Sequence, residues 1–228
     1  MINTVRGEGE PVLLVDCGGS FSSRFSSAAG EMLADKSLQV ANAMGYAAMN
    51  IGPGEFSFGI DFLRKKSSDI TFPLVASNLS YAEGVSPFTK SFVITQAGGL
   101  KVAILGVMPP GILEAMPKSG TSGLVEVIPP DKALALILPV VRKEADIVIL
   151  LSQLGATETK RLAGDLEGID LFIYGGGDNQ PAKCDEDVQA SLSTVGSEAP
   201  ALKTSAKGSH LGYARLSVDD TGRVTVDM

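Results

Sequence analysis

Two kinds of hydrophobic pattern alternate along the chain: short continuous apolar runs, and longer segments in which apolar residues recur at helical spacing. The apolar runs predict strands over Pro11–Asp16, Ala47–Ile51, Pro73–Asn78, Asp146–Ser152, Leu171–Tyr174 and Leu202–Ala206. Helical spacing predicts helices over Glu31–Met44, about 60–66, Asp131–Ala145 and about 157–166. Strands separated by glycine-bearing turns predict two β-hairpins, Phe92–Val107 and Leu211–Asp227. This order predicts an α/β fold with mixed sheets and helices on the outside.

Two segments carry no clear period and are predicted as loops, Pro109–Gly123 and Gly175–Ser197. The second is long and polar, which is uncommon in a compact domain and often functional. No internal repeat or linker divides the chain, so its 228 residues predict one domain.

Composition narrows the classes of partner. The net charge is −7 and the basic residues cluster only at Arg64-Lys65-Lys66, which disfavours nucleic-acid binding. No apolar run approaches the ~20 residues that cross a bilayer, and the polar start after Met1 lacks a signal peptide. The two cysteines, Cys17 and Cys184, allow one disulfide, two free thiols or one reactive thiol.

Glycine-rich loops follow several of the predicted strands. The segment Gly45–Gly59 reads G-Y-A-A-M-N-I-G-P-G-E-F-S-F-G and leads from a helix through a buried strand into a loop. In α/β proteins such loops, at the carboxyl ends of parallel strands, are where binding sites are built. Gly52-x-Gly54 and Gly175-Gly176-Gly177 are only weakly similar to phosphate-binding loops, because neither matches a complete motif.

Seven blocks, in order, resemble the 5′-nucleotidase / UDP-sugar hydrolase family of metallophosphoesterases. Besides Gly45–Gly59 they are Val12–Gly19, Phe72–Leu79, Lys101–Val107, Ala145–Gly155, Gly168–Asp178 and Gly208–Leu216. The resemblance covers roughly residues 12–227 and implies a metallophosphoesterase-like four-layer α/β/β/α sandwich of two mixed sheets. It also implies that the family's first strand is missing here, because the chain starts where the helix after that strand should be ending. An N-terminally incomplete domain of this kind leaves a sheet edge that invites self-association.

The family holds two metal ions, and the resemblance places most of the ligand positions on residues that lack the family's ligand side chains. The bridging aspartate falls on Gly19, the Asn-His pair on Pro53 and Gly54, and a histidine on Gln153. The His-x-His pair falls on Gly176 and Asp178, or one residue later if the loop contains a gap. Hard divalent ions need several converging oxygen or imidazole donors, so we expect no dimetal centre, no other metal and no cofactor.

The remaining candidates each have a structural and a functional interpretation. Asp16 and Glu55 either cap loops or bind a ligand, and Asp178 with the acidic run after Cys184 forms either a cation site or a solvated loop. His210, the only histidine, is either structural or lines a substrate channel. The binding candidates are Asp16, Gly18, Gly19, Gly54, Glu55, Gln153, Gly176, Asp178, Cys184 and His210.

Cys17 is the candidate catalytic residue, at the mouth of a buried strand and followed by two glycines. It is either a buried inert cysteine or a reactive thiol with a lowered pKa, paired with Cys184 or alone. Two functions stay open: a degenerate, non-hydrolytic domain that binds a small molecule or a protein, and a thiol-based redox or nucleophilic enzyme. The resemblance further implies a hydrolase ancestry and a periplasmic or extracytoplasmic location.

Overall fold

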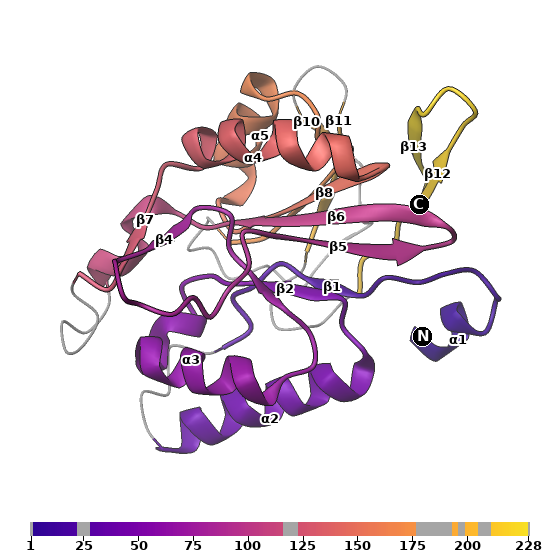
Figure 1. Ribbon diagram of the computed structural model, residues 1–228. Helices are drawn as coiled ribbons and strands as arrows, with labels where there is room; N and C mark the ends of the chain where they lie inside the picture. Colours follow the sequence, from indigo (N-terminus) through magenta and orange to yellow (C-terminus); the bar gives the residue numbers. More distant parts are fainter. Residues whose placement is uncertain are drawn as a thin grey trace.

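The protein is seen in a computed structural model that describes residues 2–21, 28–115, 123–176, 193–195, 199–204 and 211–227. The described segments form four layers, with helices on the two outer faces and two sheets between them (Figure 1). The predicted mixed α/β fold with outer helices is therefore confirmed.

The small sheet consists of three parallel strands in the order β1-β2-β3, which are Val15–Asp16, Ala48–Asn50 and Leu74–Val75. Its outer face is covered by α2 (Ala28–Met44) and α3 (Gly59–Asp69) (Figure 1). α2 buries Gly30, Ala34, Leu38 and Ala41, at the three- and four-residue spacing of one helix face. The strands are shorter than their apolar runs predict, but they lie within the predicted ranges.

The large sheet has the order β10-β11-β9-β8-β6-β5. Its central strands are parallel: β6 (Leu100–Val107), β8 (Ile147–Ser152), β9 (Leu171–Tyr174) and β11 (Ala199–Lys203). β5 (Phe92–Ala97) and β10 (Ser193–Val195) add antiparallel edges. Every residue of β8 is buried, as its unbroken apolar run predicts.

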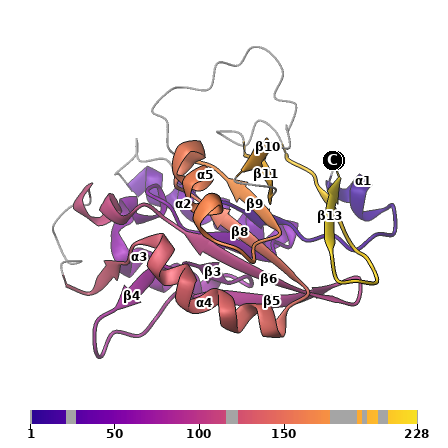
Figure 2. The same ribbon diagram turned by 90° about the horizontal axis from the view of Figure 1, so that it is seen from above.

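The outer face of the large sheet is covered by α4 (Pro130–Glu144) and α5 (Gly155–Asp165), which lie across the strands (Figure 2). Three clusters of buried apolar side chains fill the spaces between layers. One lies under α2 and α3, one under α4 and α5, and one between the two sheets, where Val75 and Ile104 are fully buried.

Several short elements differ from the predictions. A five-residue helix, α1 (Ile2–Arg6), and a two-stranded sheet of β4 (Leu79–Tyr81) and β7 (Val125–Val127) had not been predicted. The segment Pro109–Gly123 contains a 3-10 helix, η2 (Pro110–Ala115), and Gly175–Ser197 contains β10 instead of being loop throughout. A further 3-10 helix, η1 (Glu55–Phe58), precedes α3.

The C-terminal hairpin forms as predicted, from β12 (Arg215–Val218) and β13 (Val224–Asp227). It pairs with no other described strand and lies at the same end of the molecule as α1 (Figures 1 and 2). Within the described ranges, no helix has the length and apolar character needed to span a bilayer.

Candidate functional site

Four parallel strands from the two sheets end at the same place. Asn50, the last residue of β2, donates its Nδ2 hydrogens to the carbonyls of Cys17, Val107 and Leu151 at 3.0–3.1 Å. The carboxyl ends of β1, β2, β6 and β8 therefore converge, as in other α/β proteins that build a site there. The sequence interpretation passed over Asn50, although an amide at the end of a buried apolar run is a recognisable signal of a buried polar tie.

The Gln153 side chain lies at the centre of these loops. It is 4% exposed, and its Nε2 donates a hydrogen bond to the carbonyl of Gly18. A β-carbon placed on Gly19 would lie 3.3 Å from its Oε1, one on Gly52 3.0 Å from its Cδ, and one on Gly176 2.7 Å from its Oε1. The glycines thus leave room for the amide, which fills the space that side chains at these positions would share.

Two of the ligand positions implied by the family resemblance, Gly54 and Gly176, have no room for a β-carbon beside the backbone. A β-carbon on Gly54 would lie 2.3 Å from the carbonyl oxygen of Phe21, and one on Gly176 would lie 2.6 Å from that of Gln153. Gly19 and Gly176 also have φ angles of +77° and +72°, which side-chain-bearing residues rarely adopt. Gly19, Pro53, Gly54 and Gly176 have no side-chain donor for a metal ion.

Glu55 joins two of the loops. Its side chain is fully buried, and its carboxylate accepts hydrogen bonds from the backbone N–H groups of Gly19, Ser20, Phe21 and Gly52 at 2.7–3.3 Å. Burial raises the pKa of Glu55 to about 7, the Asp16 charge also raises it, and the N–H donors oppose the rise because they favour the charged form. With its oxygens taken by backbone donors, Glu55 is a tie between loops. The loop-capping interpretation fits these contacts.

Cys17 points into the core between the sheets. Its thiol is 4% exposed and donates a hydrogen bond to the carbonyl of Ile173 at 2.9 Å, with the carbonyl of Ser152 at 3.4 Å. Burial is the main cause that raises the pKa of Cys17 well above its ordinary range, and the charge of Asp16 adds to it. Of the two interpretations of Cys17, these contacts fit the buried inert cysteine, since two carbonyl oxygens and an apolar core disfavour a thiolate.

Asp16 faces the other side of the small sheet. Its carboxylate accepts hydrogen bonds from Gly18 N–H at 2.7 Å and from Ser20 Oγ at 3.0 Å, and it lines a hollow beside α2. The structure thus brings together Gly18, Gly19, Gly54, Glu55, Gln153 and Gly176 with Cys17 close behind, while Asp16 faces away. Asp178, Cys184 and His210 lie outside the described residues.

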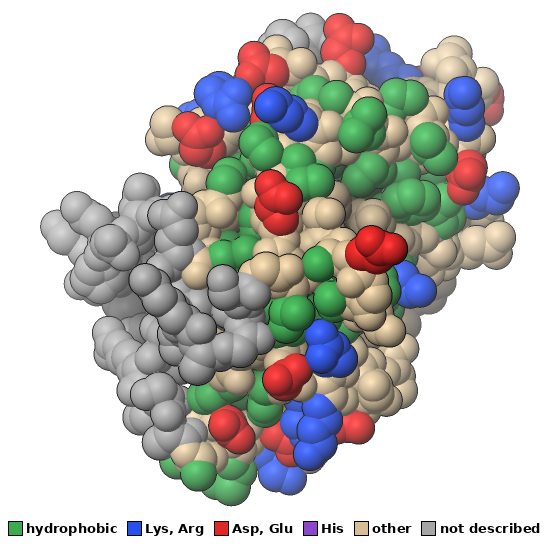
Figure 3. Space-filling model, turned by 60° about the vertical axis from the view of Figure 1, so that its left-hand side comes forward, with side chains coloured by type: hydrophobic (Ala, Val, Ile, Leu, Met, Phe, Trp, Pro, Cys, Tyr) green, Lys and Arg blue, Asp and Glu red, His purple; other side chains and the backbone are tan. Residues whose placement is uncertain are grey.

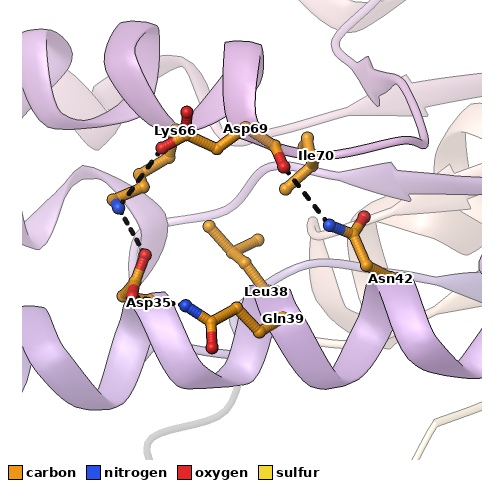
Figure 4. Close-up of a pocket in the computed structure, with 7 residues that line it drawn as sticks. All are labelled: Asp35, Leu38, Gln39, Asn42, Lys66, Asp69 and Ile70. Carbon is orange, nitrogen blue, oxygen red and sulfur yellow. Dashed lines mark hydrogen bonds and ion pairs between the residues drawn. The ribbon is translucent and has the colours of Figure 1, made fainter.

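A second hollow, of about 220 Å³, lies between α2 and α3 (Figure 4). Lys66 pairs with Asp35 and, at 3.4 Å, with Asp69, and Asn42 donates to the backbone carbonyl of Asp69 at 3.3 Å. Gln39 donates to the second oxygen of Asp35. These polar groups satisfy one another, so the hollow is a joint between two helices and shows no feature of a catalytic site.

Charged groups do not gather into a site in the described part of the chain. No group of three or more His, Cys, Asp or Glu side chains is placed to hold a metal ion there. On the face drawn in Figure 3, acidic and basic side chains are interspersed around scattered hydrophobic ones. That face has no single-sign field that would attract a polyanion.

Comparison with known proteins gives the relatives of this chain. It is 25% identical to a 2′,3′-cyclic-nucleotide 2′-phosphodiesterase/3′-nucleotidase of Salmonella typhimurium and 26% identical to a 5′-nucleotidase of Rattus norvegicus. Each match covers 98% of this chain, which spans 39% and 40% of the lengths of those two relatives. Its homologues are 5′-nucleotidase and calcineurin-like phosphoesterase family members. No family model matches the chain.

Solved structures share the fold. A calcineurin-like phosphoesterase of Bacillus subtilis superposes with a TM-score of 0.68 at 24% identity, over 90% of this chain and 71% of that one. A putative 5′-nucleotidase of Staphylococcus aureus superposes with a TM-score of 0.73 at 18% identity, over 94% and 44%. The metallophosphoesterase-like fold implied by the sequence resemblance is confirmed.

Proposed function

We propose that this chain is a 5′-nucleotidase-like domain that has lost the dimetal phosphoesterase site and binds a small molecule or a protein without hydrolysing phosphate esters. The observation that carries the proposal is the Gln153 side chain, buried among Gly19, Gly52 and Gly176. A two-metal hydrolase needs ions at such a place to position water and to stabilise the leaving oxygen.

The backbone supports the same conclusion. Restoring a histidine at Gly54 or Gly176 would drive its β-carbon into a backbone carbonyl, so more than a side-chain change would be needed. The remaining carboxylate, Glu55, has its oxygens engaged by backbone N–H groups. In this proposal the loops have kept their contacts with one another and have lost the side chains that would bind metal ions.

The direct test is hydrolysis together with metal content. The purified protein is incubated with Mn²⁺ or Zn²⁺, assayed on bis(p-nitrophenyl) phosphate, AMP and 2′,3′-cyclic AMP, and analysed for metal after dialysis. We expect turnover no faster than buffer with metal alone, and less than one bound metal equivalent per chain. An active 5′-nucleotidase handled identically is the positive control.

Two tightly held metal equivalents, with turnover that EDTA abolishes, would overturn the proposal. The binding half is tested by thermal shift with nucleotides and UDP-sugars in the absence of metal. A ligand that binds the folded state raises the melting temperature in proportion to the logarithm of its concentration. If ligands raise the melting temperature only when they are also hydrolysed, the domain is an enzyme.

We also propose that the protein works outside the cytoplasm, as the resemblance to the 5′-nucleotidase / UDP-sugar hydrolase family suggests. Fractionation of the source cells, followed by immunodetection, tests this location. Recovery only with cytoplasmic markers would contradict it.

A further inference from the structure

A hollow of about 340 Å³ lies beside α2, on the opposite side of β1 from Cys17, and is called the α2 hollow here. Its walls come from α2, from the loop after β1 and from the segment leading into β2. The lining residues are Asp16, Ser20, Leu33, Lys36, Ser37, Val40, Ala41, Met44, Tyr46 and Met49. None of the loops around Gln153 contributes to it apart from Asp16 and Ser20.

One wall of the α2 hollow is apolar. α2 buries one stripe against the sheet and presents a second, with Leu33 52% exposed and Val40 56% exposed. Met44 and Met49 continue this wall toward the sheet. Exposed aliphatic surface gains about 25 cal/mol for each Å² removed from water, so an apolar body lying here would be stabilised.

The opposite wall carries a carboxylate without a cation. Asp16 is half-buried, and the groups that contact its oxygens are Gly18 N–H and Ser20 Oγ, which occupy two of its roughly four acceptor positions. No ion pair to Asp16 occurs within the part of the chain that the structure describes. Burial raises the pKa of Asp16, as expected for a carboxylate taken from water without a counter-charge.

Tyr46 faces the same space as Asp16. Both line the hollow, and the charge of Asp16, after burial, is a cause that raises the pKa of the Tyr46 hydroxyl. Lys36 also lines the hollow, but it is exposed, and its charge is among those that hold down the pKa of Asp35. The carboxylate without a counter-charge therefore gives the hollow the sign that favours a cation.

We propose that the α2 hollow binds a small organic ammonium ion, with the ammonium group on Asp16 and the apolar body against Leu33 and Val40. The positive charge of the ligand follows from the unpaired carboxylate. Its small size follows from the volume of the hollow, which lies at the small end of the ~300–1,000 Å³ range of ligand pockets. The inference is independent of the proposed loss of hydrolysis, because none of the implied metal-ligand positions lines the hollow.

The test titrates the protein with phenethylammonium chloride and follows backbone amides by two-dimensional NMR. Two analogues of similar shape are titrated in parallel: 2-phenylethanol, which is neutral, and phenylacetate, which is an anion. We expect saturable shifts at Asp16, Val40 and Tyr46 with the amine only. Equal shifts with the three probes, or none with the amine in the millimolar range, would overturn the proposal without the need for any variant.

Two substitutions assign the charge. Asp16→Asn keeps the size and one acceptor oxygen, and we expect it to weaken amine binding about tenfold, as for a lost charged hydrogen bond. Glu31→Gln removes the same charge from an exposed position of α2 outside the hollow, and we expect a change below about twofold because salt screens it. Equal losses in both variants would mean that only net charge acts, which contradicts the proposal.

A third substitution covers the case in which Asp16→Asn does not fold. Val40 is largely exposed, so Val40→Asn leaves the core intact while removing part of the apolar wall. We expect weaker amine binding with an unchanged circular dichroism spectrum. Unchanged binding in Val40→Asn would overturn the placement of the ligand in the α2 hollow.

Discussion

Glu55 has a structural role at the point where two of the loops meet. Its carboxylate ties the loop after β1 to the loop after β2 through four backbone N–H groups. The N–H groups of Phe21 and Gly52 would be left buried and unpaired without it, at a cost of about 1–3 kcal/mol each. This structural role is sufficient to explain a buried acid here, with no substrate required.

The raised pKa of Glu55 predicts a dependence of stability on pH. The folded state, with a pKa of about 7, binds more protons than the unfolded state, with 4.5. Protonation of Glu55 therefore favours the folded state. Its stabilising effect, on the order of 3 kcal/mol in the free energy of unfolding, is fully present below pH 4.5 and is lost as pH rises through 7. Urea titrations of the parent and of Glu55→Gln at about pH 5 and pH 7.5 measure it. The parent should lose more stability than the variant over this interval; parallel losses would contradict the prediction.

The environment of Cys17 predicts a slow thiol. Its pKa is raised by burial, and attack requires a thiolate that can reach its target. In a Cys184→Ser background, we expect iodoacetamide to label Cys17 far more slowly in the folded protein than in urea. Mass spectrometry over time gives both rates. Equal labelling in the folded and unfolded protein would restore the reactive-thiol interpretation.

The sequence predicted where the candidate site lies better than what each residue does there. The family resemblance placed Gly19, Gly54, Glu55, Gln153 and Gly176 at one site, and the structure brings the loops that carry them together. The sequence left open the direction in which Cys17 points, because one residue of register separates the core side of β1 from the α2 side. The filling of the space by Gln153 also depends on packing between distant loops, which no local pattern encodes.

The secondary-structure elements also differ in how well the sequence predicts them. Long periodic elements such as α2, α4 and β8 were predicted within a few residues, because a repeated pattern specifies which face is buried. β4 and β7 were missed, since each has three residues and their pairing joins Leu79 to Val127. The partner that stabilises such a strand is remote in sequence, so the local pattern carries little information about it.

The two sheets are joined by polar contacts as well as by apolar packing. Gly106 of β6 lies beside Asn50 of β2, and a β-carbon on Gly106 would lie 2.4 Å from Asn50 Oδ1 and 2.8 Å from the carbonyl of Val75. Asn50 belongs to β2 and Val75 to β3, and the obstacle from Val75 is a backbone atom. The close approach of β6 to the small sheet therefore requires glycine.

A Gly106→Ala substitution tests how much this close approach contributes to stability, beyond the intrinsic preference of alanine over glycine. We expect a loss of about 2 kcal/mol or more, because the methyl group displaces a buried amide and a backbone carbonyl. Gly164→Ala in α5 is the matched control, since its β-carbon meets nothing within 4 Å, and should gain about 0.5 kcal/mol. Chemical denaturation gives both values. A loss in Gly106→Ala as small as the control's change would show that the sheets can move apart.

Two of the sheet edges in the described part of the chain lie next to the space between the small and the large sheet. β1 pairs with β2 alone among the described strands, and the β12–β13 hairpin pairs with none of the others. Val15 of β1 and Leu216 of β12 nevertheless pack against the same cluster between the sheets. The two edges thus border one apolar core while their outward backbone groups have no strand partner in the described part of the chain.

An open edge next to an apolar core predicts self-association, because unpaired backbone N–H and C=O groups accept a strand from another chain. We expect multi-angle light scattering to show a mass that rises with protein concentration. Val12→Lys places one charge just before β1, where a docking strand would have to bury it, and should shift the equilibrium to the monomer. Glu8→Gln changes the net charge by the same amount at an exposed position and should behave as the parent. A monomer at every concentration, or equal behaviour of the two variants, would show that the β1 edge is not an interface between copies.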